Sequence, residues 1–242
     1  MMTIATDQLT NKDHVFTNIT WFFIIPWMLI AIFGGMGPPP ETPAAWANLA
    51  LEQIVRYSIL IISGTMVTIG FLRLNALLAN TPGKTLAGYG TIMISVALPL
   101  FIANMAYWGY FLTHVFSTYS VPGAPAKPGW LKTVSEVFLV IRMIEVLLIY
   151  LSTAAFILAL RIVNHLSKPS TYVYVFFCCL GAFLNLLPNS IKGPLAIANY
   201  LSYIPAFTLL MPYLLAVNLN RKYIKNNRLI WLQPLKANNH LN

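Results

Sequence analysis

Six long runs of apolar residues dominate the chain, and short segments rich in charge or proline separate them. The runs lie at about 16–36, 54–78, 86–116, 134–163, 171–188 and 195–219. Each approaches or exceeds the length of about 17–25 residues that a helix needs to cross a bilayer. The strands of a membrane barrel would instead be alternating segments of about ten residues. The pattern therefore predicts an all-α polytopic membrane protein, built as a bundle of six transmembrane helices.

Composition supports this prediction and leaves little room for a second fold. Of the 242 residues 58% are hydrophobic and 9% are charged, whereas about 25% are charged in a typical soluble domain. We expect one transmembrane domain over residues 1–220 and a basic cytoplasmic tail over residues 221–242. Asp7, Lys12 and Asp13 precede the first apolar run, in place of the basic start of a cleavable signal peptide. The first run is therefore expected to remain in the protein as a helix.

The distribution of lysine and arginine predicts the orientation of the helices. If the N-terminus is cytoplasmic, ten basic residues fall in inside segments and three fall in outside loops. Such an excess marks the cytoplasmic side of membrane proteins, so we expect both termini to lie in the cytoplasm. The net charge of +9 does not indicate nucleic-acid binding, because the basic residues follow the ends of apolar runs. The inside residues are Lys12, Arg73, Lys84, Arg161, Lys168, Arg221, Lys222, Lys225, Arg228 and Lys236, and the outside residues are Lys127, Lys132 and Lys192.

Charged residues inside the fourth apolar run are the first candidates for a functional site. Arg142 and Glu145 lie near its middle, and Glu136 lies near its start. Ionisable groups at membrane depth cost several kcal/mol, so they usually pair, face a protein interior or take part in function. Arg142 and Glu145 are three residues apart, so they share a helix face and can pair. We favour a structural salt bridge, and the alternative is a group that binds a solute or relays a proton.

Two polar residues in other runs extend this candidate site. Arg56 lies near the outer end of the second run, where Glu52 or Glu136 is within reach. Asn104 follows Pro99 in the third run, and helix breaks at proline can line the binding cavities of transporters. The candidate intramembrane polar site comprises Arg142, Glu145, Glu136, Arg56 and Asn104.

Nothing in the sequence assigns a catalytic residue, a metal or a cofactor. His114 and His165 fall at opposite ends of the predicted bundle, and no hydrolase, zinc or nucleotide motif occurs. We therefore expect a non-enzymatic membrane protein whose polar pair serves packing or partner interaction. Its expected partners are the lipid bilayer and either another protein or a small solute. The alternative is a small-solute or proton-coupled transporter, with a cavity that reaches Glu145 and has Arg56 and Asn104 on its wall. An intramembrane enzyme is the third hypothesis.

Two stretches of the second and third runs resemble a known family. They read VRYSILIISGTMVTIGFLRLNALL and GKTLAGYGTIMISVALPLFIANM. They are similar to an uncharacterised bacterial family of six-helix membrane proteins, with an arginine opening helix two, a basic inner loop and a Pro…Asn pattern in helix three. Arg56, Arg73 with Lys84, and Pro99 with Asn104 match that pattern over about a quarter of the chain, whereas Arg142 and Glu145 are not part of it. The resemblance implies a fold and a bacterial inner membrane but no activity.

Overall fold

The described part of the chain is helical. The computed structural model describes residues 18–30, 32, 40, 42–120, 123, 126, 128–187, 193–194 and 205–231, and for residues 205–206 and 223–231 it describes the backbone alone. Within these ranges helices alternate with turns, and no strand occurs. The all-α prediction is therefore confirmed for this part of the chain. The helices are Asn18–Ile30, α2 (Pro43–Asn48), α3 (Ala50–Leu78), α4 (Lys84–Ala106), the π-helical turn η1 (Tyr107–Phe111), α5 (Leu112–Tyr119), α6 (Trp130–Ile162), α7 (Lys168–Asn185) and α9 (Pro205–Trp231).

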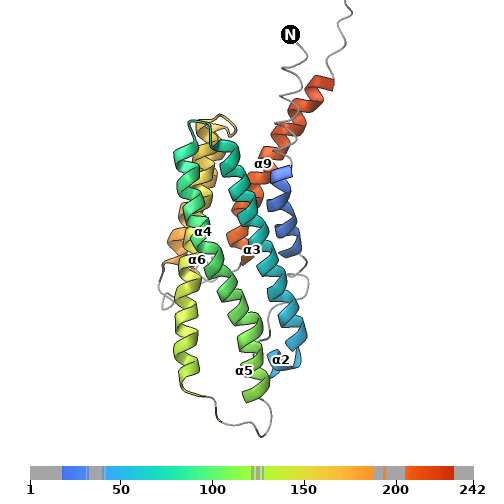
Figure 1. Cartoon of the computed structure of the whole chain (residues 1–242), viewed down its shortest axis with the longest axis vertical. Coiled ribbons are helices and arrows are strands. Elements are labelled where there is room, and N and C mark those ends of the chain that lie inside the picture. Colours follow the sequence, from blue (N-terminus) through green and yellow to red (C-terminus); the bar gives the residue numbers. More distant parts are fainter. Residues whose placement is uncertain are drawn as a thin grey trace, which may run out of the picture.

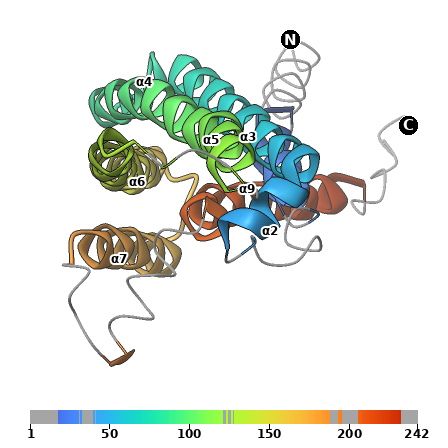
Figure 2. The same ribbon diagram turned by 90° about the horizontal axis from the view of Figure 1, so that it is seen from below.

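The helices form an elongated bundle with two distinct ends (Figure 1). Helix α4 packs between α3 and α6, and α7 lies on the far side of α6 (Figure 2). Helix α9 packs against α6 and α7. We call the lower end in Figure 1, which carries α2 and α5, the α2 end. We call the opposite end, which carries the α3–α4 and α6–α7 turns, the basic end.

Local sequence explains where α6 stops and α7 starts. Asn164 follows α6 with a φ of 57°, a left-handed conformation that asparagine tolerates better than most residues. The next residue, His165, donates its main-chain N–H to the carbonyl of Leu160 at 2.9 Å and so closes the last turn. Ser167 then caps α7, because its hydroxyl accepts the N–H of Ser170 at 3.3 Å.

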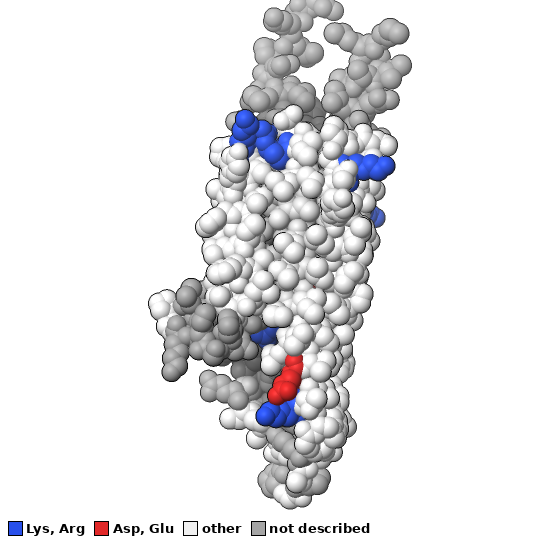
Figure 3. Space-filling model, turned by 90° about the vertical axis from the view of Figure 1, so that its left-hand side faces the viewer, with Lys and Arg blue, Asp and Glu red and all other residues white. Residues whose placement is uncertain are grey.

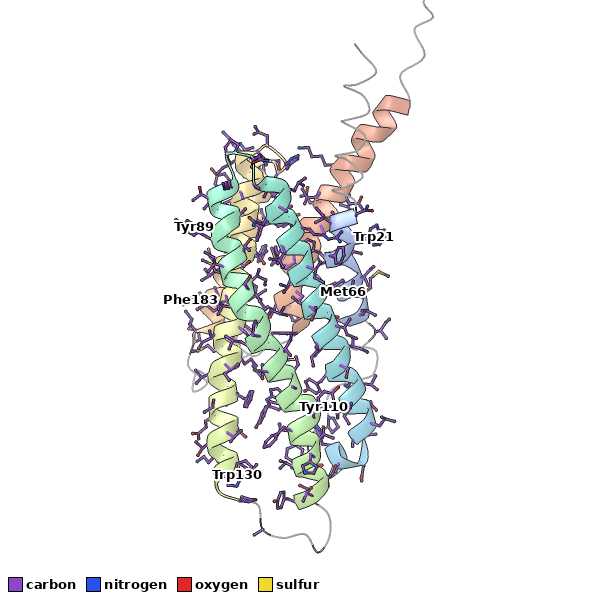
Figure 4. All side chains as sticks on the ribbon, viewed as in Figure 1. Trp21, Met66, Tyr89, Tyr110, Trp130 and Phe183 are labelled. Atoms are coloured by element: carbon purple, nitrogen blue, oxygen red, sulfur yellow. The ribbon has the colours of Figure 1, made fainter. Side chains whose placement is uncertain are left out.

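Among the residues that the structure describes, three helices are long and apolar enough to cross a membrane. They are α3, the continuous helix formed by α4, η1 and α5 (Lys84–Tyr119), and α6. Large apolar side chains project from the sides of the bundle, among them Trp21, Tyr89 and Phe183, which are 45%, 56% and 58% exposed (Figure 4). Charged side chains lie toward the ends of the face shown in Figure 3, with a broad uncharged band between them. This surface is typical of a membrane protein.

The helix boundaries match the apolar runs closely at three places and differ at two. Helix α3 and the helix Lys84–Tyr119 cover the second and third predicted spans and extend past them by a few residues. Helix α6 starts before the fourth predicted span and ends one residue short of its end. Helix α2 was not predicted, although Thr42 and Pro43 form a start signal, with the Thr42 hydroxyl accepting the N–H of Ala45 at 3.2 Å. Helix α9 runs across residue 220 without a break. Part of the first and sixth predicted spans, and residues 232–242 of the predicted tail, lie outside the described residues.

Candidate functional site

The half of the bundle nearer the basic end has an apolar core. Phe71 and Phe156 are fully buried there and stack with their ring centroids 4.8 Å apart. Helices α4 and α6 approach closely at Gly90, where an added Cβ atom would lie 2.7 Å from the Phe156 ring. The Ser152 hydroxyl donates to the Gly90 carbonyl at 2.8 Å. The buried hydroxyls of Thr68 and Thr153 likewise donate to main-chain carbonyls, at 3.0 and 2.8 Å.

The half nearer the α2 end buries amides and charged groups instead. Gln53, Arg56 and Asn104 are 0–1% exposed, and Glu145 is 2% exposed. They come from three helices: Gln53 and Arg56 from α3, Asn104 from α4 and Glu145 from α6. Burying such groups is costly unless they are hydrogen-bonded or paired. These side chains therefore mark the candidate functional site.

Asn104 and Glu145 connect α4 to α6 near the middle of the bundle. The Asn104 side-chain amide donates to Glu145 Oε1 at 2.9 Å, and both residues are buried. This bond fixes the orientation of the amide, because its nitrogen must face the carboxyl group. Asn104 Oδ1 and Glu145 Oε2 have no hydrogen-bond partner within the described part of the chain. The pair is thus satisfied on one side and leaves two buried acceptor oxygens on the other.

The two arginines of the predicted site lie on different helices and act on one tyrosine. Arg56 forms an ion pair with Glu52 one turn earlier in α3, and its Nε donates to Glu52 Oε1 at 2.8 Å. Arg142 is half-buried on α6, one turn closer to the α2 end than Glu145. Its charge acts on both the Glu145 carboxyl and the Tyr57 hydroxyl, and the charge of Arg56 also acts on Tyr57. Arg56 and Arg142 are therefore close to the same tyrosine.

The π-helical turn η1 lies between α3 and α6 and contacts both helices. Tyr107 faces α6, where its ring stacks on Phe138 with centroids 4.0 Å apart and its hydroxyl lies 2.7 Å from Ser135 Oγ. Gly109 packs directly on the Tyr57 ring, so a larger residue cannot occupy that position without displacing α3. A single π turn inserts one residue and is frequent at functional sites. Here it lets one short segment contact both neighbouring helices.

Helix α2 closes the α2 end with an aromatic cluster. Trp46 is 5% exposed and donates its indole N–H to the Thr113 hydroxyl at 2.9 Å. Its ring lies 6.0 Å from Tyr57 and 5.8 Å from Phe116, measured between centroids. These contacts cover the polar side chains of α3 from the end of the bundle. The buried polar site therefore lies between this aromatic cap and the apolar core.

All five predicted site residues lie in the half of the bundle nearer the α2 end, but only four of them face its interior. Arg56, Asn104 and Glu145 are buried and Arg142 is half-buried, whereas Glu136 is exposed on the surface of α6. Of the two partners predicted for Arg56, the described ion pair is with Glu52. Sequence reasoning missed Gln53, which is fully buried with both amide atoms lacking partners in the described ranges. Its position three residues before Arg56, on the same face of α3, was the available signal.

Metal binding and similarity to known proteins add no further assignment. Within the described residues no group of three or more histidine, cysteine, aspartate or glutamate side chains is placed to hold a metal ion. No family model matches the chain, and no match was found among curated proteins or among solved structures.

Proposed function

We propose that this chain is a non-enzymatic, multi-pass protein of a bacterial cytoplasmic membrane, with six spans and both termini in the cytoplasm. The polar side chains in its interior hold the helices in register and so shape the surface offered to a partner. The hydrogen bond from Asn104 to Glu145 carries this proposal, because it joins α4 to α6, the pair of helices with the most extensive contact. The aromatic cap and the broad uncharged band are consistent with burial in a bilayer.

A double-mutant cycle tests the packing role of this bond. Asn104→Leu and Glu145→Leu, singly and together, are compared for unfolding of the purified protein in detergent. Each single change leaves a buried polar group without its partner, so each is expected to lower the unfolding free energy by about 1–3 kcal/mol. The double variant should recover part of this loss, with a coupling of about 0.6–1.7 kcal/mol. Asn104→Leu combined with the exposed Glu136→Leu serves as the matched control and should be additive. A coupling near zero for Asn104 and Glu145 would contradict the packing role.

A second function, access for a small solute, is favoured by a separate observation. Asn104 Oδ1 and Glu145 Oε2 are buried acceptors without partners within the described ranges, whereas a group used only for packing is normally satisfied. Thiol labelling tests access, in a background with Cys178 and Cys179 replaced by alanine. A membrane-impermeant maleimide should modify Glu145→Cys from the outer side and spare Ile149→Cys, one turn deeper. Equal protection of both positions would eliminate this second function.

A further inference from the structure

The deep end of the polar site presents more hydrogen-bond acceptors than donors. The Asn104 amide nitrogen is already used by Glu145 Oε1. What remains there is Asn104 Oδ1 and Glu145 Oε2, both buried acceptors without partners in the described part of the chain. Two such oxygens are matched by a group that donates hydrogen bonds, such as an ammonium or a hydroxyl.

The end of the same site nearer α2 presents positive charge. Arg142 precedes Glu145 by one turn on α6, about 4.5 Å along the helix axis at 1.5 Å per residue. Arg56 approaches from α3, where it is paired with Glu52, and both guanidinium charges act on the Tyr57 hydroxyl. Guanidinium groups bind carboxylates strongly, often through two parallel hydrogen bonds. The site is therefore polarised along the bundle, with cations toward the α2 end and free acceptors toward the middle.

We propose that the α2-end half of the bundle binds a small carboxylate that carries a hydrogen-bond donor on the adjacent carbon, as α-amino and α-hydroxy acids do. The carboxylate faces Arg142 and Arg56, and the donor faces Asn104 Oδ1 and Glu145 Oε2. This inference rests on the second function above, access for a small solute. The inference adds the chemical class of that solute and its orientation along the bundle.

Burial and packing explain why such a ligand would be selected. The Trp46 cluster shields the α2 end, and the Phe71–Phe156 core closes the other side. Between these apolar boundaries, a carboxylate without a donor leaves the two acceptor oxygens unmatched. An amine without a carboxylate meets the charge of Arg142. A molecule that carries both groups satisfies both ends of the site.

Binding to the full-length protein in lipid nanodiscs tests the proposal. The probes are the twenty standard α-amino acids, then L-lactate as the hydroxyl analogue of L-alanine and propionate as the analogue without a donor. At least one amino or hydroxy acid should raise the melting temperature saturably and change tryptophan fluorescence. Propionate should bind at least tenfold more weakly than L-alanine or L-lactate. Preference for the amino or the hydroxy acid identifies the donor, and absence of binding by all probes at 10 mM, or equal binding of propionate, overturns the proposal.

Matched variants locate the binding site. Glu145→Gln and Arg142→Gln should each weaken binding at least tenfold, whereas Glu136→Gln, the same change at an exposed position of α6, should leave it unchanged. Arg142→Lys retains the charge in case Arg142→Gln fails to fold, and it should bind more weakly than the unaltered protein but better than Arg142→Gln. Binding that survives both Glu145→Gln and Arg142→Gln would overturn the assignment. If Glu145→Cys is labelled from the outer side but no probe binds, solute access stands and the ligand class is wrong.

Discussion

Near the basic end, several buried hydroxyls bond to main-chain carbonyls, whereas the half nearer the α2 end also buries amides and charged groups. Thr68 and Thr153 illustrate the first kind, since each hydroxyl donates to a carbonyl four residues earlier, at 3.0 and 2.8 Å. Gln53 and Glu145 illustrate the second, since each keeps at least one buried atom without a partner among the described residues. The two halves of one bundle thus differ in how completely their polar groups are satisfied.

This difference separates stability from function within one molecule. Incompletely satisfied polar groups lower the stability of a fold, so their persistence points to a use that the fold alone does not supply. In the half with the apolar core, shortening a buried side chain should lower the unfolding free energy most. In the half with the polar site, removing the unpartnered amide of Gln53 should stabilise the protein, whereas removing Asn104 or Glu145 breaks their hydrogen bond and should destabilise it.

The largest expected effect is in the apolar half. Phe156 is fully buried against Phe71 and Gly90, so Phe156→Ala leaves a cavity that rigid neighbours cannot fill. The unfolding free energy should fall by about 3–5 kcal/mol, measured by denaturant titration in detergent with circular dichroism. Phe183→Ala is the matched control, because Phe183 is 58% exposed, and its effect should be within about 0.5 kcal/mol. Similar losses for both variants would show that the apolar half is not the stabilising core.

The next effect should have the opposite sign. Gln53 is fully buried, and neither of its amide atoms has a partner in the described ranges. Gln53→Leu removes an unsatisfied group at similar volume, so the unfolding free energy should rise by about 1–3 kcal/mol. Gln53→Glu keeps the size of the side chain and adds a charge, and it should lower the same quantity. A loss of stability in Gln53→Leu would indicate that the amide is satisfied and would remove the contrast between the halves.

Much of this architecture was predictable from the sequence, because apolar runs of membrane length have few alternative structures. The positions of α3 and α6 follow from that pattern alone. The hydrogen-bond partner of Glu145 could not be predicted from this pattern. Spacing along one helix favoured Arg142, whereas the hydrogen bond comes from Asn104 on another helix, 41 residues away. Helix spacing reports only neighbours within a helix, and contacts between helices depend on rotation and register.

Two further features differ from what the sequence predicts. Glu136 is a candidate because of its position in the apolar run, but it is exposed, and its spacing of nine residues from Glu145 already places it on the other side of α6. The π turn at Tyr107–Phe111 has no signature in the residues YWGYF. Gly109 within this turn lies close to Tyr57, a contact that exists only once α3 and the helix Lys84–Tyr119 have packed.

A smaller effect is expected at the aromatic cap. Trp46→Phe keeps most of the ring contacts but loses the hydrogen bond to the Thr113 hydroxyl, which is 2.9 Å long and buried. The unfolding free energy should fall by about 1 kcal/mol. Thr113→Val removes the same bond from the other side, so the two changes together should cost less than their sum. Full additivity would show that the bond does not hold α2 on the bundle, and that the cap is fixed by ring packing alone.

The smallest effect should come from the hydroxyl that joins α4 to α6 near the basic end. Ser152 donates to the Gly90 carbonyl at 2.8 Å, and Ser152→Ala removes this donor. Gly90 lies inside α4, so its carbonyl also accepts a main-chain bond of the helix and is not left unsatisfied. The loss should therefore be about 0.5 kcal/mol, close to the average for hydrogen bonds between membrane helices. Ser117→Ala is the control, because its hydroxyl bonds to the Thr113 carbonyl of its own helix, and it should have a smaller effect still. A loss at Ser152 as large as that of Asn104→Leu would place the main polar link between α4 and α6 at the basic end, and the contrast between the two halves would no longer separate stability from function.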